Sequence, residues 1–147
     1  MGKQTSDYTF KNNFIIKNMT KSKKNKLNDY YTPDSIFYDK DNEIILEHSS
    51  TGDRKVHIGE LTQFIEYAIN SPNDKKKSLI IFLDGSSKHA PKVEKEHDRL
   101  KKYIDDLFIY LNLKYINFIG IVKYSKELNN LDLEILYSKC KKVLERR

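Results

Sequence analysis

The stretch PDSIFYDKDNEIILEHS at residues 33–49 decides the fold class, because it predicts two paired β-strands. Residues 35–38 and 43–49 are rich in β-branched and aromatic side chains, and the polar residues 39–42 between them are typical of a turn. With those residues as the loop, three pairs face each other across the hairpin: Tyr38 with Glu43, Ile36 with Ile45, and Asp34 with Glu47. The stretch therefore predicts an antiparallel hairpin that brings two acidic side chains together.

Asp34 and Glu47 place two carboxylates opposite each other on this hairpin. Side chains directly opposite each other in an antiparallel pair have Cβ atoms roughly 4.5–5.5 Å apart. Two carboxylates at that distance repel each other, and a divalent cation between them offsets the repulsion. Ser49, two residues beyond Glu47, faces the same side of its strand. The hairpin by itself therefore predicts a metal site at Asp34 and Glu47.

Downstream of the hairpin, amphipathic segments alternate with fully apolar ones. Apolar residues at helical spacing predict helices over residues 58–69 and 93–111, and residues 50–55 before the first of them are expected to form a loop. Apolar runs at residues 79–83 and 116–122 predict strands buried on both faces. A final helix is expected from about Leu133 to Glu145, since acidic residues lie at its start and basic residues at its end.

This order of elements predicts an α/β fold. An antiparallel hairpin plus parallel strands forms one mixed β-sheet, flanked by helices on both faces. The length of 147 residues suits one domain. We expect a basic, partly flexible N-terminal segment at residues 1–30 and the folded domain at residues 31–147.

The N-terminal segment carries most of the net charge of +6. Residues 1–30 contain seven lysines and two aspartates, which leaves +5 in that segment. Such a basic segment attracts a polyanion such as nucleic acid, and the alternative is a solvated leader. The segment therefore favours, without proving, a partner that carries phosphates.

Several other classes of protein are disfavoured by the sequence. It has no apolar run of the ~20 residues that cross a bilayer and no secretory signal, so we expect a soluble, cytoplasmic protein without membrane contact. The single cysteine, Cys140, excludes an internal disulfide and is expected on a buried helical face. Zinc-ligand spacing, a phosphate-binding glycine-rich loop and a Gly-x-Ser-x-Gly motif are all missing from the sequence.

Pro33-Asp34 and Glu47-x-Ser49, followed by a helix, resemble the PD-(D/E)xK nuclease superfamily. Within it, residues 31–147 look most like the cleavage domain of type IIS restriction endonucleases, whose core is the same mixed sheet with flanking helices. The resemblance implies a Mg²⁺-dependent endodeoxyribonuclease, with Mn²⁺ as a substitute. Asp34, Glu47 and the backbone carbonyl of His48 would hold the metal.

The resemblance also leaves a question about positive charge. The superfamily's lysine has no match, because Ser49 stands at its position, as in Glu-x-Ser variants among small subunits of heterodimeric type IIS enzymes. Asp34, Glu47, Ser49 and Lys55 are the candidate catalytic residues, and Lys55 is the candidate source of the missing charge. Basic side chains are expected to contact DNA phosphates: Lys21, Lys23, Lys24, Lys26, Arg54 and His57.

A second group of residues lies along the first predicted helix. Glu60, Gln63 and Tyr67 share one polar face of that helix. Gln63-x-x-x-Tyr67 resembles a motif of the exonuclease and helicase-nuclease branch of the superfamily, where it supports the site beside the DNA. The alternative is a solvent-facing stripe. His48 is expected on the face opposite Glu47, in a packed position.

The expected partner is double-stranded DNA. Because one catalytic centre cuts one strand, the resemblance implies a homodimer, through residues 93–111 or 133–145, or else a recognition domain or subunit. Two alternatives stay open. One is a Holliday-junction resolvase or another structure-selective nuclease, and the other is a catalytically inactive nuclease fold that binds DNA or protein.

Overall fold

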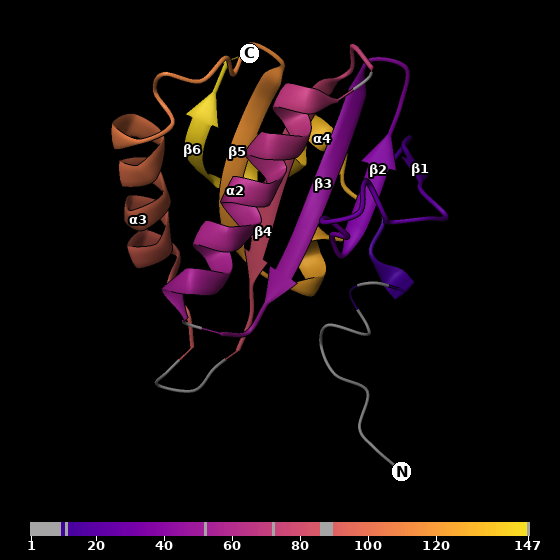
Figure 1. The fold of residues 1–147 in the computed structure, drawn as a ribbon. Helices are drawn as coiled ribbons and strands as arrows, with labels where there is room; N and C mark the ends of the chain where they lie inside the picture. Colours follow the sequence, from indigo (N-terminus) through magenta and orange to yellow (C-terminus); the bar gives the residue numbers. More distant parts are fainter. Residues whose placement is uncertain (1–9, 11, 52, 72, 86–89, 147) are drawn as a thin grey trace.

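The computed structural model describes residues 10, 12–51, 53–71, 73–85 and 90–146. Its centre is a six-stranded sheet, covered by helices on both faces (Figure 1). The strands, in their order across the sheet, are β1 Thr20–Lys21, β2 Ser35–Tyr38, β3 Asn42–Ser49, β4 Lys76–Leu83, β5 Ile116–Lys123 and β6 Lys141–Glu145. The helices are α2 Arg54–Asn70, α3 Val93–Asp106 and α4 Leu133–Lys139, with a short 3₁₀ turn, η1, at Lys126–Leu128. The predicted α/β class is confirmed.

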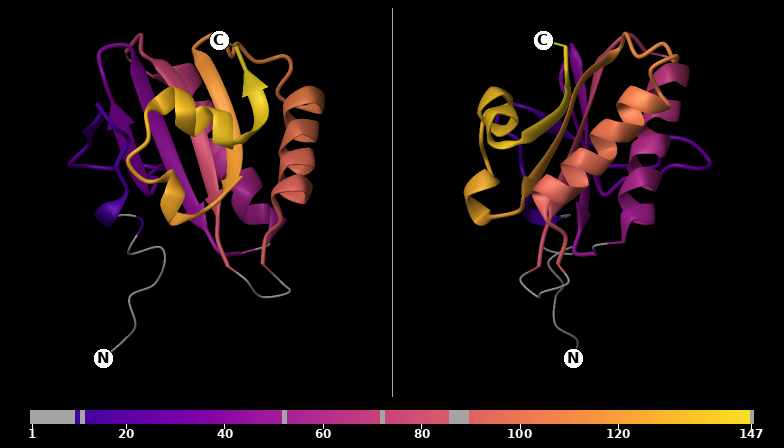
Figure 2. Two further views of the ribbon diagram at one scale, coloured as in Figure 1. Left: turned by 180° about the vertical axis from the view of Figure 1, so that it is seen from behind. Right: turned by 90° about the vertical axis from the view of Figure 1, so that its left-hand side faces the viewer.

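The sheet is mixed, as predicted. Strands β1, β2 and β3 pair antiparallel, β3, β4 and β5 pair parallel, and β6 returns antiparallel to β5. The two parallel connections run through α2 and α3, which cover the same face of the sheet. Figure 2 shows α4 and η1 on the other face. We call these the α2 face and the α4 face.

The hairpin has the predicted register. Ile36 pairs with Ile45 and Tyr38 with Glu43 across β2 and β3. The turn between them is held by the Asp39 carboxylate, whose Oδ1 accepts the N–H groups of Asp41 (2.9 Å) and Asn42 (2.8 Å). Aspartate at this position favours a turn because its side chain replaces a backbone acceptor. The register of the hairpin therefore follows from the turn.

Side chains of the central strands alternate between two hydrophobic cores. On the α2 face, Ile45, Leu79 and Ile119 are fully buried against residues of α2 and α3. Even-numbered neighbours such as Ile44 and Ile80 are fully buried on the α4 face. This burial on both sides explains the continuous apolar runs in β4 and β5. It also separates Glu47, on the α2 face, from His48, on the α4 face.

The N-terminal segment is part of the fold from Phe10 onward. Phe10, Phe14 and Ile16 are buried in the core of the α4 face, beside Phe82. The N–H of Lys17 donates to the carbonyl of Leu131 (2.9 Å), which ties this segment to the far end of the chain. The packing therefore runs across the expected boundary at residue 30. Residues 1–9 lie outside the described part of the chain.

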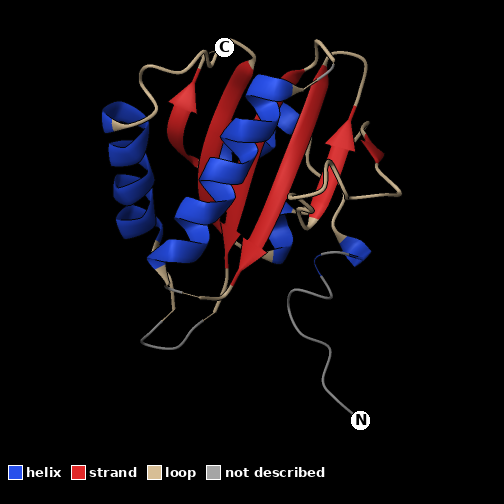
Figure 3. Ribbon diagram, in the orientation of Figure 1, coloured by secondary structure: helices blue, strands red, loops and turns tan. Residues whose placement is uncertain are grey.

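The C-terminal region corrects one prediction. The expected helix from Leu133 to Glu145 ends at Lys139, and residues 141–145 form β6, as the secondary-structure colours of Figure 3 distinguish. Strand β6 supplies hydrogen-bond partners to the edge of β5. Gly120 in β5 allows the close approach, since a Cβ there would lie 2.8 Å from the Cβ of Cys140. Cys140 is buried as predicted, but it follows α4 instead of lying within a longer helix.

Two other helix boundaries also differ from prediction. Helix α2 begins at Arg54, because Asp53 caps it by accepting the N–H of Lys55 (2.9 Å), so residues 54 and 55 are helical and not loop. Helix α3 ends at Asp106, and Leu107, Ile109 and Tyr110 beyond it are exposed. None of the described helices is long and apolar enough to span a membrane.

Candidate functional site

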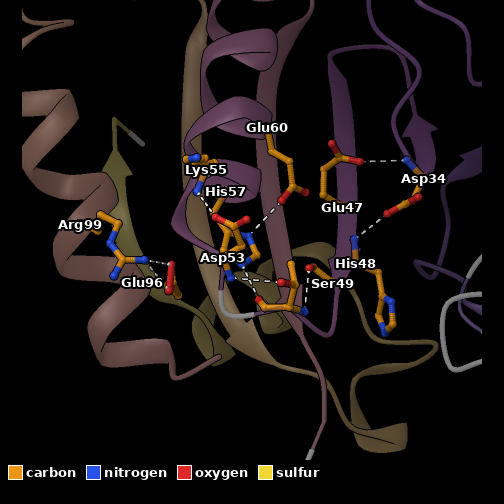
Figure 4. A network of polar contacts seen from close by, with 11 residues as sticks. Asp34, Glu47, His48, Ser49, Asp53, Lys55, His57, Glu60, Glu96 and Arg99 are labelled. Atoms are coloured by element: carbon orange, nitrogen blue, oxygen red, sulfur yellow. Dashed lines mark hydrogen bonds and ion pairs between the residues drawn. The ribbon is translucent and has the colours of Figure 1, made fainter. Parts of the chain in front are cut away.

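Asp34 and Glu47 lie together at the open end of the hairpin, as the register predicts. The N–H of Asp34 donates to Oε1 of Glu47 (3.0 Å), and Oδ2 of Asp34 accepts the N–H of His48 (2.7 Å) (Figure 4). Hydrogen bonds from N–H groups to carboxylates are among the stronger ones and offset part of the repulsion between the two acids. Glu47 is only 7% exposed. The backbone of the hairpin therefore holds two acidic side chains in a confined place.

The backbone and the side chain of His48 point in different directions. The backbone groups point toward the start of β2, and the ring lies on the α4 face. The N–H and C=O of a residue in an antiparallel pair point to the same neighbouring strand. Because the N–H of His48 points to Asp34, its carbonyl is directed to that side as well, beyond the first residue of β2. The ring packs on the α4 face, stacked on Phe10 with 5.0 Å between centroids, and its Nε2 lies 3.2 Å from Oδ2 of Asp84. The predicted packed position of the ring is confirmed.

The donors at this end of the hairpin are all oxygens. Magnesium prefers carboxylate and carbonyl oxygens and is commonly bound by one or two carboxylates, with waters completing its shell. Asp34, Glu47 and the His48 carbonyl fit that preference. Among the described residues, no group of three or more His, Cys, Asp or Glu side chains could hold a metal ion.

Two predicted catalytic residues lie apart from Asp34 and Glu47: Ser49, at the position of the superfamily's lysine, and Lys55, the candidate source of the missing positive charge. Ser49 accepts the N–H of Thr51 with its hydroxyl (3.2 Å). Lys55 is exposed in the first turn of α2, and Figure 4 shows it beside Asp53 and away from Glu47. The side chain of Arg54 lies outside the described part of the structure. In this arrangement Lys55 therefore does not take the place of the superfamily's lysine beside Glu47.

Glu60 is held in place by a buried histidine. His57 is 0% exposed, its Nδ1 lies 2.9 Å from Oε1 of Glu60, and its Nε2 lies 3.0 Å from the carbonyl oxygen of Thr51. The Thr51 carbonyl can only accept, and so can Glu60 when it is ionised. With both ring nitrogens donating to these two oxygens, the imidazole carries a positive charge. The expected contact of His57 with DNA is therefore corrected, because the ring is enclosed and fully engaged.

The surroundings of His57 favour its charge. Burial alone lowers its pKa, but the hydrogen bond and charge of Glu60, with the Thr51 carbonyl and the charge of Glu96, raise the pKa overall. Glu96 comes from α3 and is itself paired with Arg99 (2.8 Å). His57 therefore links α2 to the loop before it, and the charge of Glu96 on α3 acts on its ring.

Gln63 and Tyr67 hold α2 against other parts of the fold. The Gln63 side-chain amide donates to the carbonyl of Tyr30 (3.0 Å), and the Tyr67 hydroxyl donates to Oε1 of Glu43 (2.6 Å). Burial, then the hydrogen bond and charge of Glu43, raise the pKa of Tyr67. Tyr67 is buried, so the two residues do not form a solvent-facing stripe. Their hydrogen bonds tie α2 to Tyr30, in the chain before β2, and to Glu43, at the start of β3.

Sequence reasoning missed Tyr31. Its side chain is 3% exposed, and its hydroxyl has no hydrogen-bond partner in the described structure. Burial raises the pKa of Tyr31, and the negative charges of Glu47, Glu60 and Asp34 raise it further. Tyr31 therefore stays protonated, and the charges of the acidic residues of the site act on it. The only signal in the sequence is an aromatic residue shortly before Pro33-Asp34.

Unpaired polar atoms gather around this segment. Three buried side-chain atoms of the described residues have no hydrogen-bond partner, and all come from residues 25–35: Asn25 Oδ1, the Tyr31 hydroxyl and the Ser35 hydroxyl. Buried polar groups are nearly always paired, and exceptions often indicate a water or ion that completes the site. The chain just before β2 is therefore the part of the fold that best accommodates such a group.

The predicted DNA-contacting lysines lie in the same segment. Lys23, Lys24 and Lys26 are exposed, and Lys26 has its Nζ 3.6 Å from Asp29. Lys21 is partly buried, which lowers its pKa. Asn25, between these lysines, donates to the carbonyl of Asp34 (2.9 Å). The basic segment is therefore attached to the residue that begins the site.

Comparisons of the chain with protein-family models, with curated proteins and with solved structures found no significant match. The arguments for function therefore depend on the geometry described above: the acidic pair, its oxygen donors, the buried hydroxyl and the adjoining lysines.

Proposed function

We propose that this protein is a Mg²⁺-dependent endonuclease that hydrolyses phosphodiester bonds of DNA at Asp34 and Glu47. One observation carries the proposal: the Asp34 N–H donates to the Glu47 carboxylate (3.0 Å) at the open end of the hairpin. Two acidic residues held side by side by backbone hydrogen bonds, in a partly enclosed place, suit a divalent cation. The position of this pair agrees with the Pro-Asp and Glu-x-Ser residues that resemble the PD-(D/E)xK superfamily.

The residues of the chain have separate tasks in this proposal. Asp34, Glu47 and the His48 carbonyl would hold the cation, which would lower the pKa of a bound water and offset charge on the phosphate. Lys23, Lys24 and Lys26 attract the DNA backbone, and such contacts carry no sequence information. Binding should therefore weaken steeply as salt increases, and cleavage should be indifferent to base sequence.

The finer part of the proposal follows the resemblance to type IIS cleavage domains. A single site cuts one strand, so cleavage of both strands requires a second copy of the chain, or the domain is delivered by a recognition domain or subunit. We propose a homodimer acting on double-stranded DNA in the cytoplasm. Sedimentation of the protein with and without DNA tests the dimer, and a monomer that cuts both strands at a rate linear in concentration would contradict it.

The decisive experiment is cleavage of a supercoiled plasmid with Mg²⁺ by the wild type and by the Glu47→Ala and Asp34→Ala variants. We expect both variants to lose cleavage. Asp105→Ala is the control, because this exposed acid of α3 is paired with Lys101 and belongs to another part of the fold. Unchanged Mg²⁺-dependent cleavage by either site variant would refute the assignment. Replacing the plasmid with a four-way junction tests the resolvase alternative.

A second candidate function is a catalytically inactive nuclease fold that binds DNA. It is favoured by one observation, that Ser49 replaces the superfamily's lysine while Lys55 lies away from Glu47. Calorimetric titration with Mg²⁺ and Mn²⁺ separates the two functions. Metal binding that disappears in Glu47→Ala supports the enzyme, and DNA binding without metal binding supports the inactive fold.

A further inference from the structure

Tyr30 projects from the chain shortly before the proposed metal site. Its side chain is 87% exposed, although the next residue, Tyr31, is buried. A single exposed aromatic side chain is common on protein surfaces and by itself indicates no function. Tyr30 differs from such a side chain in how firmly its backbone is held and in the surface around its ring.

The backbone of Tyr30 is fixed by hydrogen bonds on both sides. Its N–H donates to Oδ1 of Asn28 (2.8 Å), and its carbonyl accepts the side-chain amide of Gln63 from α2 (3.0 Å). The turn that carries Tyr30 is closed by the N–H of Leu27, which donates to the carbonyl of Tyr31 (3.0 Å). A tyrosine held in this way loses little further freedom when a ligand covers its ring, because only two side-chain torsions are left to fix.

Tyr30 borders two open hollows along α2. One has a volume of about 320 Å³ and is also lined by Gln63 and Glu66. The other, again of about 320 Å³, is also lined by Leu27, Glu66 and Asn70. Each is at the small end of the ~300–1,000 Å³ range of ligand pockets, so each suits a group no larger than one small ring system. The tyrosine ring therefore has room beside it for a flat ligand.

Positive charge and the metal site lie close to Tyr30 along the chain. Residues 23–26, which precede its turn, include three exposed lysines. Asp34 follows Tyr30 by four residues, and a chain of that length spans at most about 14 Å. One DNA strand advances about 3.4 Å per nucleotide along the helix axis, so Tyr30 lies within about four nucleotides of a phosphate bound at Asp34.

The charges around the hollows favour a base over a phosphate. Glu66 lines both hollows, and its negative charge repels a phosphate but not a neutral base. An aromatic side chain stacks on a base of any type, because every base has a π face. The lysines of residues 23–26 suit the phosphates that flank such a base. The surface thus separates a place for a base from a place for the backbone.

We propose that Tyr30 stacks on an unpaired base of DNA whose phosphates lie on the lysines of residues 23–26. The inference rests on the part of the proposed function that makes DNA the ligand. A base inside a duplex is already stacked between its neighbours, so the base that covers Tyr30 comes from a single-stranded tail, a flap or a frayed end. The protein therefore binds a junction of duplex and single strand more tightly than a blunt duplex, without preference for the type of base.

The test measures binding without Mg²⁺, by fluorescence anisotropy, to a labelled blunt duplex and to the same duplex with single-stranded tails of either polarity. Tyr30→Ala keeps both backbone hydrogen bonds of residue 30 and removes the ring. We expect it to weaken binding to a tailed duplex by about fivefold to 150-fold, the loss of one stacked base, and to leave the blunt duplex unaffected. Tyr30→Phe should bind like the wild type. Tyr110→Ala is the matched control, because Tyr110 is 91% exposed but lies beyond α3, and it should change neither affinity.

Two results would overturn the inference. Equal weakening on the blunt and tailed duplexes would show that Tyr30 contacts the DNA backbone and not a base. Unchanged affinity for both would show that Tyr30 does not contact DNA. Sedimentation of the Tyr30→Ala variant without DNA is measured alongside, and a loss of self-association with unchanged DNA binding would assign this surface to a second copy of the chain.

Failure of this inference and failure of the nuclease proposal give different results. If the wild type cleaves plasmid DNA and Tyr30→Ala binds both duplexes as the wild type does, only the Tyr30 inference fails. If the preference for tails depends on Tyr30 but the wild type does not cleave, the inference stands and the nuclease proposal fails. A wild type that binds no DNA refutes both.

Discussion

Each face of the sheet has a buried tyrosine, and the two differ in whether the hydroxyl has a hydrogen-bond partner. On the α4 face, Tyr137 is 1% exposed, its hydroxyl is 2.7 Å from that of Ser78, and its ring packs 4.2 Å from that of Phe118. On the α2 face, Tyr31 is 3% exposed, but its hydroxyl has no partner in the described structure, and the charges of nearby acids raise its pKa. The first arrangement is what packing for stability produces.

The second arrangement costs stability, and such costs concentrate at functional sites. Adjacent residues of β3 show the same division, since Glu47 joins the acidic group on one face while His48 packs on Phe10 on the other. The comparison teaches that the open end of the hairpin, where the Tyr31 and Ser35 hydroxyls lie unpaired, is where this fold departs from good packing. That is the reason to look for function there.

The largest effect that tests this comparison comes from Glu47→Gln. The glutamine keeps an oxygen to accept the Asp34 N–H but removes the charge. We expect cleavage to fall by about 10³-fold, since a cation provides several kcal/mol of transition-state stabilisation. Stability should hold or rise, because repulsion from Asp34 is removed. Plasmid cleavage and denaturant titration measure the two quantities, and near-normal cleavage would break the comparison.

The next effect is on stability. His57→Ala leaves Glu60 without its buried partner, and breaking such a pair typically costs about 3–5 kcal/mol. The matched control is His97→Ala: His97 contacts Asp98 (3.0 Å) and the Lys142 carbonyl (2.8 Å) in the same pattern but near the surface. The control should change stability little. Equal losses in the two variants would show that the buried pair contributes nothing special.

A smaller effect on stability distinguishes a paired from an unpaired hydroxyl on the α4 side of the sheet. Tyr137→Phe leaves the fully buried Ser78 hydroxyl without a partner and should cost about 1–3 kcal/mol. Ser35→Ala removes a buried hydroxyl that already has no partner, and should cost nothing or stabilise slightly. Denaturant titration of both variants checks this. A cost for Ser35→Ala as large as that of Tyr137→Phe would contradict the distinction.

The smallest effect is a dependence of stability on pH. Because the folded-state pKa of His57 is raised, its contribution to stability is fully present below its unfolded pKa of about 6.5 and is lost as the pH rises through the higher folded value. The free energy of unfolding should therefore decline over that range in the wild type. His57→Gln should remove this part of the decline, and identical pH profiles would argue against a charged His57.

Much of the fold could be predicted because its signals are local. The turn at residues 39–42 and the two-residue period of the strands are enough to pair Ile36 with Ile45, and that register brings Asp34 to Glu47. Apolar periodicity likewise located α2, β4 and β5, with errors at their ends. The cap that starts α2 was missed because Asp53 was assigned to a loop.

The rest depended on partners distant in the chain. Residues 141–145 suit a helix by charge and apolar spacing, but the free edge of β5 makes them a strand. Phe10 is buried only because β4 and β5 build a face that it can cover.

By itself the sequence determined the α/β class, the hairpin and the acidic pair, because side-chain periodicity and turn length set register within a short segment. Only the tertiary structure decided which polar groups find partners. It enclosed His57 between Glu60 and the Thr51 carbonyl, and it left the buried Tyr31 hydroxyl unpaired. The physical reason is that burial and hydrogen bonding of a side chain depend on elements brought together by folding, which local sequence does not specify.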